Sequence, residues 1–138
     1  MQVKELMTRD VDIITPSTTV QKAARIMRDD GVGSLLVGEN DRLVGVLTDR
    51  DVVLRVVADG RAAETTPAGD AMSGDVLYCY EDETAEEVCA NMGGNQIRRL
   101  PVLNRDKRLV GVVSLGDLAA AGSTRAAAGA LEGIAQRA

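Results

Sequence analysis

The sequence contains no histidine, phenylalanine or tryptophan. Histidine is the usual general base and the commonest metal ligand in proteins, so its absence argues against most acid-base and metal-dependent catalysis. The sequence also has no glycine-rich phosphate loop ending in Lys-Ser or Lys-Thr, and no Cys-x-x-Cys pair to hold zinc. We therefore expect a protein that is not an enzyme, with no catalytic and no metal-binding residues.

Long apolar runs and signal patterns are absent as well. No apolar run approaches the length that spans a bilayer, and the N-terminus lacks the basic, apolar and small-residue order of a secretion signal. The net charge of −5 argues against nucleic acid as a partner, because a phosphate backbone needs a broad basic surface. These absences predict a cytoplasmic protein that binds neither membranes nor nucleic acids.

Aromatic and sulfur-containing side chains are few. Tyr78 and Tyr80 are the only aromatic residues, so the core must consist of aliphatic side chains and methionine. With 138 residues, the chain is long enough for a substantial core if its two halves share one. Cys79 and Cys89 fit either two buried free thiols or a disulfide or redox pair, and the expected cytoplasmic setting favours the buried thiols.

The most informative feature is a repeat. Residues 43–52, Leu-Val-Gly-Val-Leu-Thr-Asp-Arg-Asp-Val, return 66 positions later as residues 109–118, Leu-Val-Gly-Val-Val-Ser-Leu-Gly-Asp-Leu. In both copies an apolar run passes through one glycine, reaches a hydroxyl residue and meets an aspartate three positions on. This pattern predicts a strand followed by the start of a helix. A helix start leaves backbone N–H groups without partners, which favours an anion nearby.

The repeat extends upstream. Residues 19–27 match residues 84–92 at a spacing of 65, and apolar side chains stand at i, i+3, i+4 and i+7 in both copies. The predicted buried stripes are Val20, Ala23, Ala24 and Met27 in the first copy, and Ala85, Val88, Cys89 and Met92 in the second. A carboxylate run at 81–83, followed by Glu86 and Glu87, precedes the second of these helices. It permits a metal site, but its position favours stabilisation of the helix start.

The element order is the same in both copies. In the first copy the pattern predicts a short opening helix at 3–7, a strand at 11–14, a helix from Ser17 or Thr18 to Arg28, two strands at 34–37 and 43–47, and a last helix at 49–58. In the second copy it predicts a short helix that ends at 72, a strand at 76–80, a helix at 84–92, two strands at 100–103 and 109–114, and a last helix from 115 to about 121. The predicted domains are 1–60 and 68–122, joined by a linker at 61–67. An Ala- and Gly-rich tail at 123–138 is compatible with a marginal helix, a frayed end or a partner-docking segment.

The order Leu6-Met7-Thr8, strand, helix to Met27, strand and the segment 43–51 resembles a CBS domain, named after cystathionine β-synthase. Two such domains in tandem resemble a Bateman module, and the second copy adds Gln-Ile-Arg-Arg-Leu-Pro-Val at 96–102, similar to a motif of this family. The resemblance covers about residues 1 to 122 and is strongest to small stand-alone CBS-pair proteins of bacteria. It implies an α+β fold of two β-α-β-β-α repeats packed with pseudo-twofold symmetry.

Two hydroxyl–aspartate pairs, Thr48 with Asp51 and Ser114 with Asp117, are the central candidates for a site. A hydroxyl residue followed three positions later by a carboxylate also describes a capping box, in which the pair only starts a helix. In the resembling family, the hydroxyl lies by the phosphate of a ligand and the aspartate accepts hydrogen bonds from the ribose hydroxyls. Both interpretations remain open for each pair.

The basic residues differ between the copies. Arg98 and Arg99 stand where the first copy has Gly33 and Ser34, and Arg50 stands where the second copy has Gly116. The arginine pair is compatible with a solvated strand end or with a phosphate clamp, since guanidinium groups match phosphate oxygens. The family resemblance places this pair at the central cleft. We therefore expect two unequal sites, with phosphate drawn towards the arginine pair.

The resemblance implies a regulatory, energy-sensing module that binds an adenosyl ligand in the cleft between its two domains. AMP, ADP, ATP, NAD and S-adenosylmethionine all present a ribose diol, and no cofactor is required. Thr8 and Ser73, which follow the opening helices, are further candidates for the wall of the site. We also expect a homodimer, because apolar helix surface is left over in such small halves. The alternative is a homodimeric interaction module that binds no ligand.

Overall fold

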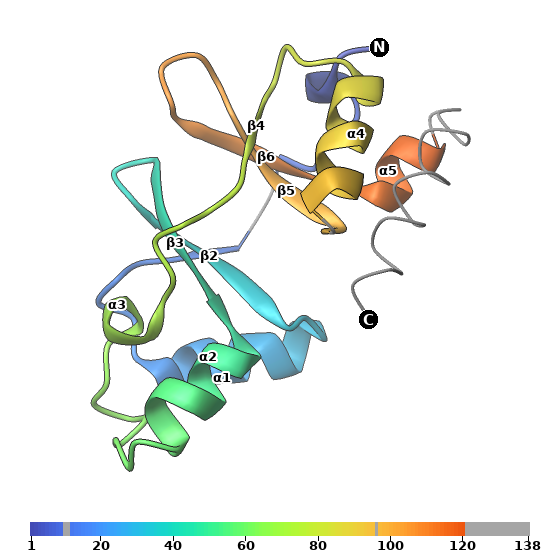
Figure 1. Cartoon of the computed structure of the whole chain (residues 1–138). Coiled ribbons are helices and arrows are strands. Elements are labelled where there is room, and N and C mark those ends of the chain that lie inside the picture. Colours follow the sequence, from blue (N-terminus) through green and yellow to red (C-terminus); the bar gives the residue numbers. More distant parts are fainter. Residues whose placement is uncertain (10–11, 96, 121–138) are drawn as a thin grey trace. The chain divides into compact units, whose positions relative to one another are not determined.

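The computed structural model describes residues 1–9, 12–95 and 97–120, so the predicted tail at 123–138 lies outside the described residues. Two three-stranded sheets carry the described part of the fold (Figure 1). The first sheet consists of β1 (Ile13–Ile14), β2 (Ser34–Glu39) and β3 (Arg42–Thr48), and the second of β4 (Cys79–Tyr80), β5 (Arg99–Leu103) and β6 (Leu109–Ser114). In each sheet the first strand is parallel to the second, which pairs with the third as an antiparallel hairpin.

The helices occupy the predicted places between the strands. They are the 3₁₀ helix η1 (Val3–Glu5), α1 (Val20–Asp30), α2 (Asp49–Val52) continued by the π-helical segment η2 (Val53–Val57), α3 (Ala68–Ala71), α4 (Ala85–Asn95) and α5 (Leu115–Ala120). This order confirms the predicted α+β class. The strands β1 and β4 are shorter than predicted, because each pairs with only two residues of its neighbour. Within the described ranges, every helix is too short or too polar to cross a bilayer.

The start of α1 is set by a side chain that the sequence pattern did not single out. The Thr19 hydroxyl, rather than Ser17 or Thr18, accepts a hydrogen bond from the Lys22 N–H at 3.2 Å. Gly31 ends the helix in the left-handed region at φ 66°, where a residue without a side chain is unstrained. The buried stripe is Val20, Ala23 and Met27; Ala24, which we predicted to be buried, is exposed.

Each sheet buries its own aliphatic core. Helix α1 packs on the first sheet, around Leu35, Val37 and Leu47. On the second sheet, α4 buries all four predicted residues, which are Ala85, Val88, Cys89 and Met92. Cys79 and Cys89 both lie in this second core as free thiols, as predicted. The packing of the two repeats about a pseudo-twofold axis stays a prediction.

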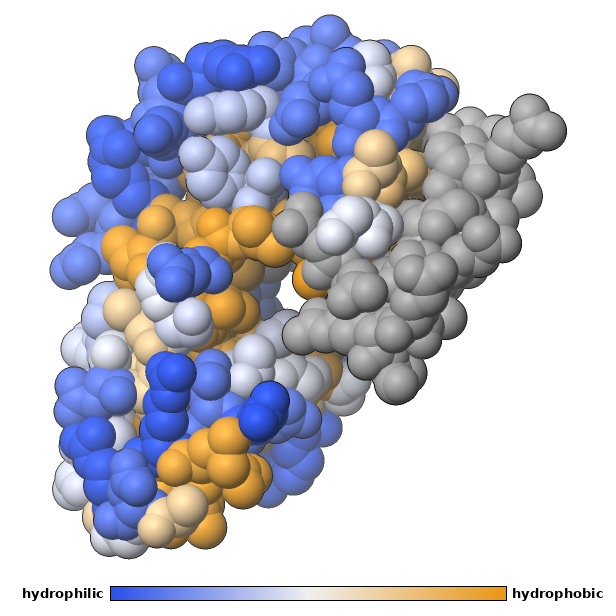
Figure 2. Space-filling view, in the orientation of Figure 1, coloured by the Kyte–Doolittle hydropathy of each residue, from blue (hydrophilic) through white to orange (hydrophobic). Residues whose placement is uncertain are grey.

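The helix formed by α2 and η2 covers its sheet with one side only. Val56 is fully buried in the first core, whereas Val53, Leu54 and Val57 are 55%, 49% and 66% exposed. Figure 2 shows an apolar patch over this helix. An exposed group of three large aliphatic side chains on one short helix indicates a contact surface.

The compact units of the structure do not follow the repeats. Residues 12–76 form one unit, here called the continuous unit. The described residues 1–9, 77–95 and 97–120 form the other, here called the split unit. The predicted linker at 61–67 lies inside the continuous unit, where Thr66 is buried and its carbonyl accepts a hydrogen bond from the Val20 N–H at 2.9 Å.

This division arises because the first residues of each repeat pair with the sheet of the other repeat. Thr8, from the first repeat, exchanges backbone hydrogen bonds of 2.8 and 2.9 Å with Val112 of β6. Ser73, from the second repeat, does the same with Val46 of β3 at 2.9 and 3.0 Å. We call residues 1–9 and 61–76 the opening segments, and each protects the third strand of a sheet that belongs to the other copy.

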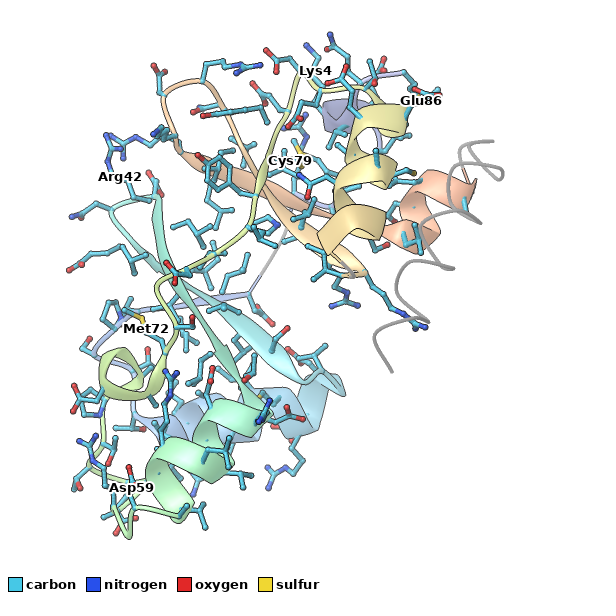
Figure 3. The ribbon with its side chains drawn as sticks, viewed as in Figure 1. Lys4, Arg42, Asp59, Met72, Cys79 and Glu86 are labelled. Atoms are coloured by element: carbon cyan, nitrogen blue, oxygen red, sulfur yellow. The ribbon has the colours of Figure 1, made fainter. Side chains whose placement is uncertain are left out.

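The repeated glycine of β3 and β6 makes this pairing possible. A Cβ atom at Gly45 would lie 2.7 Å from Met72 Sδ and 2.8 Å from the Ser73 carbonyl oxygen. A Cβ atom at Gly111 would lie 2.7 Å from the Thr8 carbonyl oxygen. Figure 3 shows Met72 at the end of α3, beside β3. Contacts this short do not occur in folded proteins, so any side chain here displaces the opening segment.

We predict that Gly45→Ala and Gly111→Ala each lower the free energy of unfolding by about 1–3 kcal/mol, the usual cost of overpacking. Gly74→Ala is the control, because a Cβ atom there meets nothing within 4 Å. This control should change the free energy of unfolding by less than about 0.5 kcal/mol. Urea denaturation measures all three, and equal stability of the Gly45→Ala and Gly74→Ala proteins would contradict the argument.

We also predict that a fragment of residues 12–76 is more stable than a fragment of residues 1–60, although the second corresponds to the predicted first domain. The 1–60 fragment lacks Ala68 and Ala71, which are fully buried in the first core, and the two hydrogen bonds of Ser73. Circular dichroism during urea titration compares the two. A later unfolding midpoint for 1–60 would show that the repeat, rather than the compact unit, is the stable piece.

Candidate functional site

The hairpin of each sheet brings the predicted site residues together at the end away from its turn. Ser34 lies opposite Thr48 in the β2–β3 register, and Arg99 lies opposite Ser114 in the β5–β6 register. The helix that follows each hairpin is attached by the same hydrogen bond: the Asp49 N–H donates to the Gly33 carbonyl, and the Leu115 N–H to the Arg98 carbonyl, both at 2.9 Å. The two ends therefore share one backbone arrangement.

We give each end a name. The continuous-unit cluster consists of Gly33, Ser34, Thr48, Asp49, Arg50 and Asp51, and the split-unit cluster consists of Arg98, Arg99, Ser114, Leu115, Gly116 and Asp117. Each cluster lies within one compact unit and combines a strand end, a hydroxyl residue and a carboxylate. The predicted candidates Thr48, Arg50 and Asp51 thus lie together, as do Arg98, Arg99, Ser114 and Asp117.

Both hydroxyl–aspartate pairs form complete capping boxes. The Thr48 N–H donates to Asp51 Oδ2, and the Asp51 N–H donates to Thr48 Oγ1, both at 3.0 Å. In the second copy the Ser114 N–H donates to Asp117 Oδ2 at 2.9 Å, and the Asp117 N–H to Ser114 Oγ at 3.1 Å. The capping interpretation is therefore correct for both pairs, and it accounts for the helix starts at these points.

Capping does not use all the hydrogen-bonding capacity of these carboxylates. Asp51 and Asp117 are half-buried, and within the described ranges the Oδ1 atom of each accepts no hydrogen bond. A carboxylate has about four lone-pair positions, so one oxygen can cap the helix while the other accepts a ligand hydroxyl. The cap also holds the carboxylate in a fixed orientation. Capping and ligand binding are therefore compatible at these two residues.

The arginine side chains are exposed. Arg50, Arg98 and Arg99 have no ion pair or hydrogen bond from their guanidinium groups to other described residues. This fits a solvated strand end, and it also leaves the guanidinium groups available to an anion. Arg98 and Arg99 belong to the same cluster as Ser114 and Asp117, so the second copy has two cationic residues at the strand end that adjoins its helix start.

Thr8 and Ser73 each pair with the third strand of the sheet that belongs to the other repeat. Thr8 pairs with Val112, two residues before Ser114, and Ser73 pairs with Val46, two residues before Thr48. Thr8 is therefore in the unit of the split-unit cluster, and Ser73 in that of the continuous-unit cluster. The sequence repeat suggests the opposite pairing, because it does not reveal the exchange of opening segments.

The acidic run before α4 stabilises local structure. Thr84 caps the helix through the Glu87 N–H, with Glu86 and Glu87 in its first turn. Asp82 pairs with Arg105 through two hydrogen bonds of 2.7 and 2.9 Å, and this guanidinium group lowers the pKa of Asp82. Arg105 also lies 4.0 Å from the centre of the Tyr80 ring. Among the described residues, no three side chains of His, Cys, Asp or Glu are placed to hold a metal ion.

The thiols of Cys79 and Cys89 are unreactive. Burial in the second core is the main cause that raises the pKa of Cys79 to about 12, and burial also raises the pKa of Cys89. Figure 3 shows Cys79 on the side of the sheet that faces α4. Because the thiolate is the reactive form, both side chains stay protonated and unreactive at neutral pH in the folded protein. Their role is packing.

The sequence sets Asp49 against Leu115 of the second copy, but it does not show the contact that Asp49 makes. Its carboxylate lies over Gly33, and a Cβ atom at Gly33 would be 3.2 Å from Asp49 Oδ2. The only signal was the alignment of the copies, in which Gly33 and Asp49 of the first correspond to Arg98 and Leu115 of the second. Because both positions change together, the two clusters carry opposite charge at the same place.

Comparison with known proteins identifies relatives for the whole repeat. The family model of the CBS domain matches residues 3–58 and 68–123. The CBS domain-containing protein YhcV of Bacillus subtilis is 41% identical over 117 residues, which cover 85% of this chain and 82% of that protein. Both matches span the two clusters.

Solved structures agree with this relationship. The crystal structure of Hypoxic Response Protein I with two coordinated zinc ions has a TM-score of 0.76 and 33% identity, covering 88% of this chain and 98% of that one. The crystal structure of CBSX2 in complex with AMP has a TM-score of 0.74 and 25% identity, covering 89% and 96% of the two chains. One of these similar proteins therefore binds an adenine nucleotide.

Proposed function

Because this chain belongs to the CBS domain family and carries two copies of the domain in tandem, we propose that it is a regulatory module without catalytic activity, which binds an adenosyl ligand such as AMP, ADP or ATP. The observation that carries this proposal is the duplicated capping box. In each copy one carboxylate oxygen caps a helix, and the other accepts no hydrogen bond within the described part of the chain. The complex of the similar protein CBSX2 with AMP supports the choice of ligand class.

We assign the ribose to the aspartates. The Oδ1 atoms of Asp51 and Asp117 accept hydrogen bonds from the vicinal hydroxyls, a charge-assisted contact that a ligand without a diol does not make. Thr48 and Ser114 lie nearer the phosphate, and Arg98 and Arg99 bind its oxygens through their guanidinium groups. NAD and S-adenosylmethionine carry the same diol and belong to the same ligand class. Arg50, Thr8 and Ser73 stay subsidiary candidates.

A second candidate function is a homodimeric interaction module that binds no ligand. The patch formed by Val53, Leu54 and Val57 favours it, because these side chains are about half or more exposed on one helix. A self-complementary contact about a twofold axis buries such a patch against its own copy. We propose that the protein forms a homodimer through this helix, whether or not it also binds a ligand.

The ligand proposal predicts that Asp117→Asn and Asp117→Ala both weaken the binding of AMP by about tenfold to a hundredfold, since a hydrogen bond to a charged group contributes roughly 1.5–3 kcal/mol. If Asp117 only caps α5, the asparagine variant retains the affinity, because its amide oxygen still accepts the Ser114 N–H. Calorimetric titration with AMP measures the affinity, and urea denaturation reports the cap. Asp106→Asn, in an exposed turn of the same unit, is the control.

The dimer proposal predicts that light scattering gives about twice the chain mass of 14.6 kDa at micromolar concentration. Val57→Asp should give the mass of one chain, because a buried unpaired carboxylate is costly in an apolar interface. Leu77→Asp is the matched control, since Leu77 is 46% exposed and belongs to the other unit. A wild-type protein with the mass of one chain would overturn the proposal.

A further inference from the structure

The two clusters share their backbone and their capped aspartate, so these common features cannot make them select different ligands. Their charges differ. The continuous-unit cluster has two carboxylates, Asp49 and Asp51, and one guanidinium group, Arg50. The split-unit cluster has two guanidinium groups, Arg98 and Arg99, and one carboxylate, Asp117. These substitutions give the two clusters opposite net charge, which favours ligands of different charge.

The Asp49 carboxylate lies close to the backbone of Gly33. The φ angle of Gly33 is outside the left-handed region, so its backbone accepts a side chain without strain. The space that a side chain would fill is taken by the Asp49 carboxylate, whose Oδ2 and Cγ atoms lie 3.2 and 3.5 Å from the Cβ position. Asp49 Oδ1 is held by the Arg50 N–H at 2.8 Å. A negative charge therefore stands beside position 33, to which Arg98 corresponds in the second copy.

The second copy reverses both positions. Leu115 replaces Asp49 and turns into the second core, where it is 6% exposed. This leaves the strand end free for Arg98, whose side chain is exposed. The pair of Gly33 with Asp49 thus gives this strand end an anion in the first copy, and the pair of Arg98 with Leu115 gives it a cation in the second.

A second group of carboxylates adds to the negative charge of the continuous unit. Asp12 precedes β1, and Asp30 ends α1 three residues before Gly33. A hydrogen bond that the protonated Asp30 carboxyl donates to the Asp12 carboxylate is the main cause that raises the pKa of Asp30, and the charges of Asp12 and Asp29 act in the same direction. At the positions of Asp12, Asp29 and Asp30 the second repeat has Leu77, Gly94 and Asn95, none of which is charged.

We infer that the two clusters bind adenosyl ligands of different charge, and that Asp49 is the residue that sets the difference. The split-unit cluster takes a nucleotide through its phosphate. The continuous-unit cluster rejects phosphate and takes an adenosine derivative that is uncharged or positively charged at the 5′ position. Like charges repel a phosphate at this end, whereas a cation gains from the same field. This inference rests on the proposed function, since both clusters must bind the ribose.

The experiment isolates each cluster in the full-length protein. Asp117→Asn leaves the continuous-unit cluster, and Asp51→Asn leaves the split-unit cluster; asparagine keeps a cap acceptor in both. The probes are AMP, adenosine and 5′-amino-5′-deoxyadenosine, which are an anion, a neutral molecule and a cation with one shared nucleoside. We expect the Asp117→Asn protein to prefer the neutral and cationic probes over AMP. We expect the Asp51→Asn protein to prefer AMP.

Asp49→Asn, added to the Asp117→Asn protein, tests the residue itself. Asparagine has the same shape and can still accept the Arg50 N–H, so the helix start is retained. Affinity for AMP should rise by about tenfold and affinity for adenosine should not change, because the variant removes one charge near the phosphate. Asp41→Asn is the control: it makes the same change of net charge in the β2–β3 turn, at the opposite end of the hairpin. It should leave all three affinities unchanged.

The outcomes separate the two proposals. If the wild-type protein binds none of the three probes, the proposed function is wrong and this inference falls with it. If the probes bind with the same order of affinity at both clusters, or if Asp49→Asn and Asp41→Asn have the same effect, the inference alone is wrong. A loss of stability in Asp49→Asn without a change in the AMP to adenosine affinity ratio also overturns it, because Asp49 then serves only to start its helix.

Discussion

The close approach of an opening segment to a glycine in the third strand of each sheet is the contact on which the rest of the structure depends. Gly45 and Gly111 allow the backbone of Ser73 and Thr8 to pair with β3 and β6, which otherwise end their sheets with an unpaired edge. The pairing fixes which residues belong to which compact unit. It also holds the strands whose ends carry the capped aspartates, so the site inherits its geometry from a contact several residues away.

Under the proposed function, each capped aspartate serves both structure and ligand binding. A carboxylate that caps a helix is held by two backbone contacts and loses little further freedom when a ligand arrives. The cost of ordering the side chain is met during folding, so binding energy is not spent on it. Under the proposed function, selectivity must then come from neighbouring side chains. We infer that these neighbours are Asp49 in one copy and Arg98 in the other.

Much of this structure was predictable from sequence, because repeated local patterns have local causes. The strand and helix after each repeated glycine, the buried stripe of α4 and the position of the site residues at the hairpin ends follow from periodicity and from the duplication. The exposure of Ala24 did not follow, since the stripe pattern is the same in both copies and its counterpart Cys89 is buried. Nor did the exchange of opening segments, because a repeat does not specify which copy of a strand its first residues pair with. The Asp49 contact with Gly33 depends on side-chain direction, which a sequence pattern does not contain.

The exchange of opening segments has a consequence for recombination between related genes. A crossover in the predicted linker at 61–67 moves a whole repeat, yet it replaces the sheet of one unit and the edge-pairing segment of the other. The hybrid must then match two foreign contacts at once, at Gly45 and at Gly111. A crossover near residue 76, where the continuous unit ends, leaves the first of these contacts within one parent. The viable boundaries for shuffling this protein are therefore those of the compact units, and they are hidden from an alignment of its repeats.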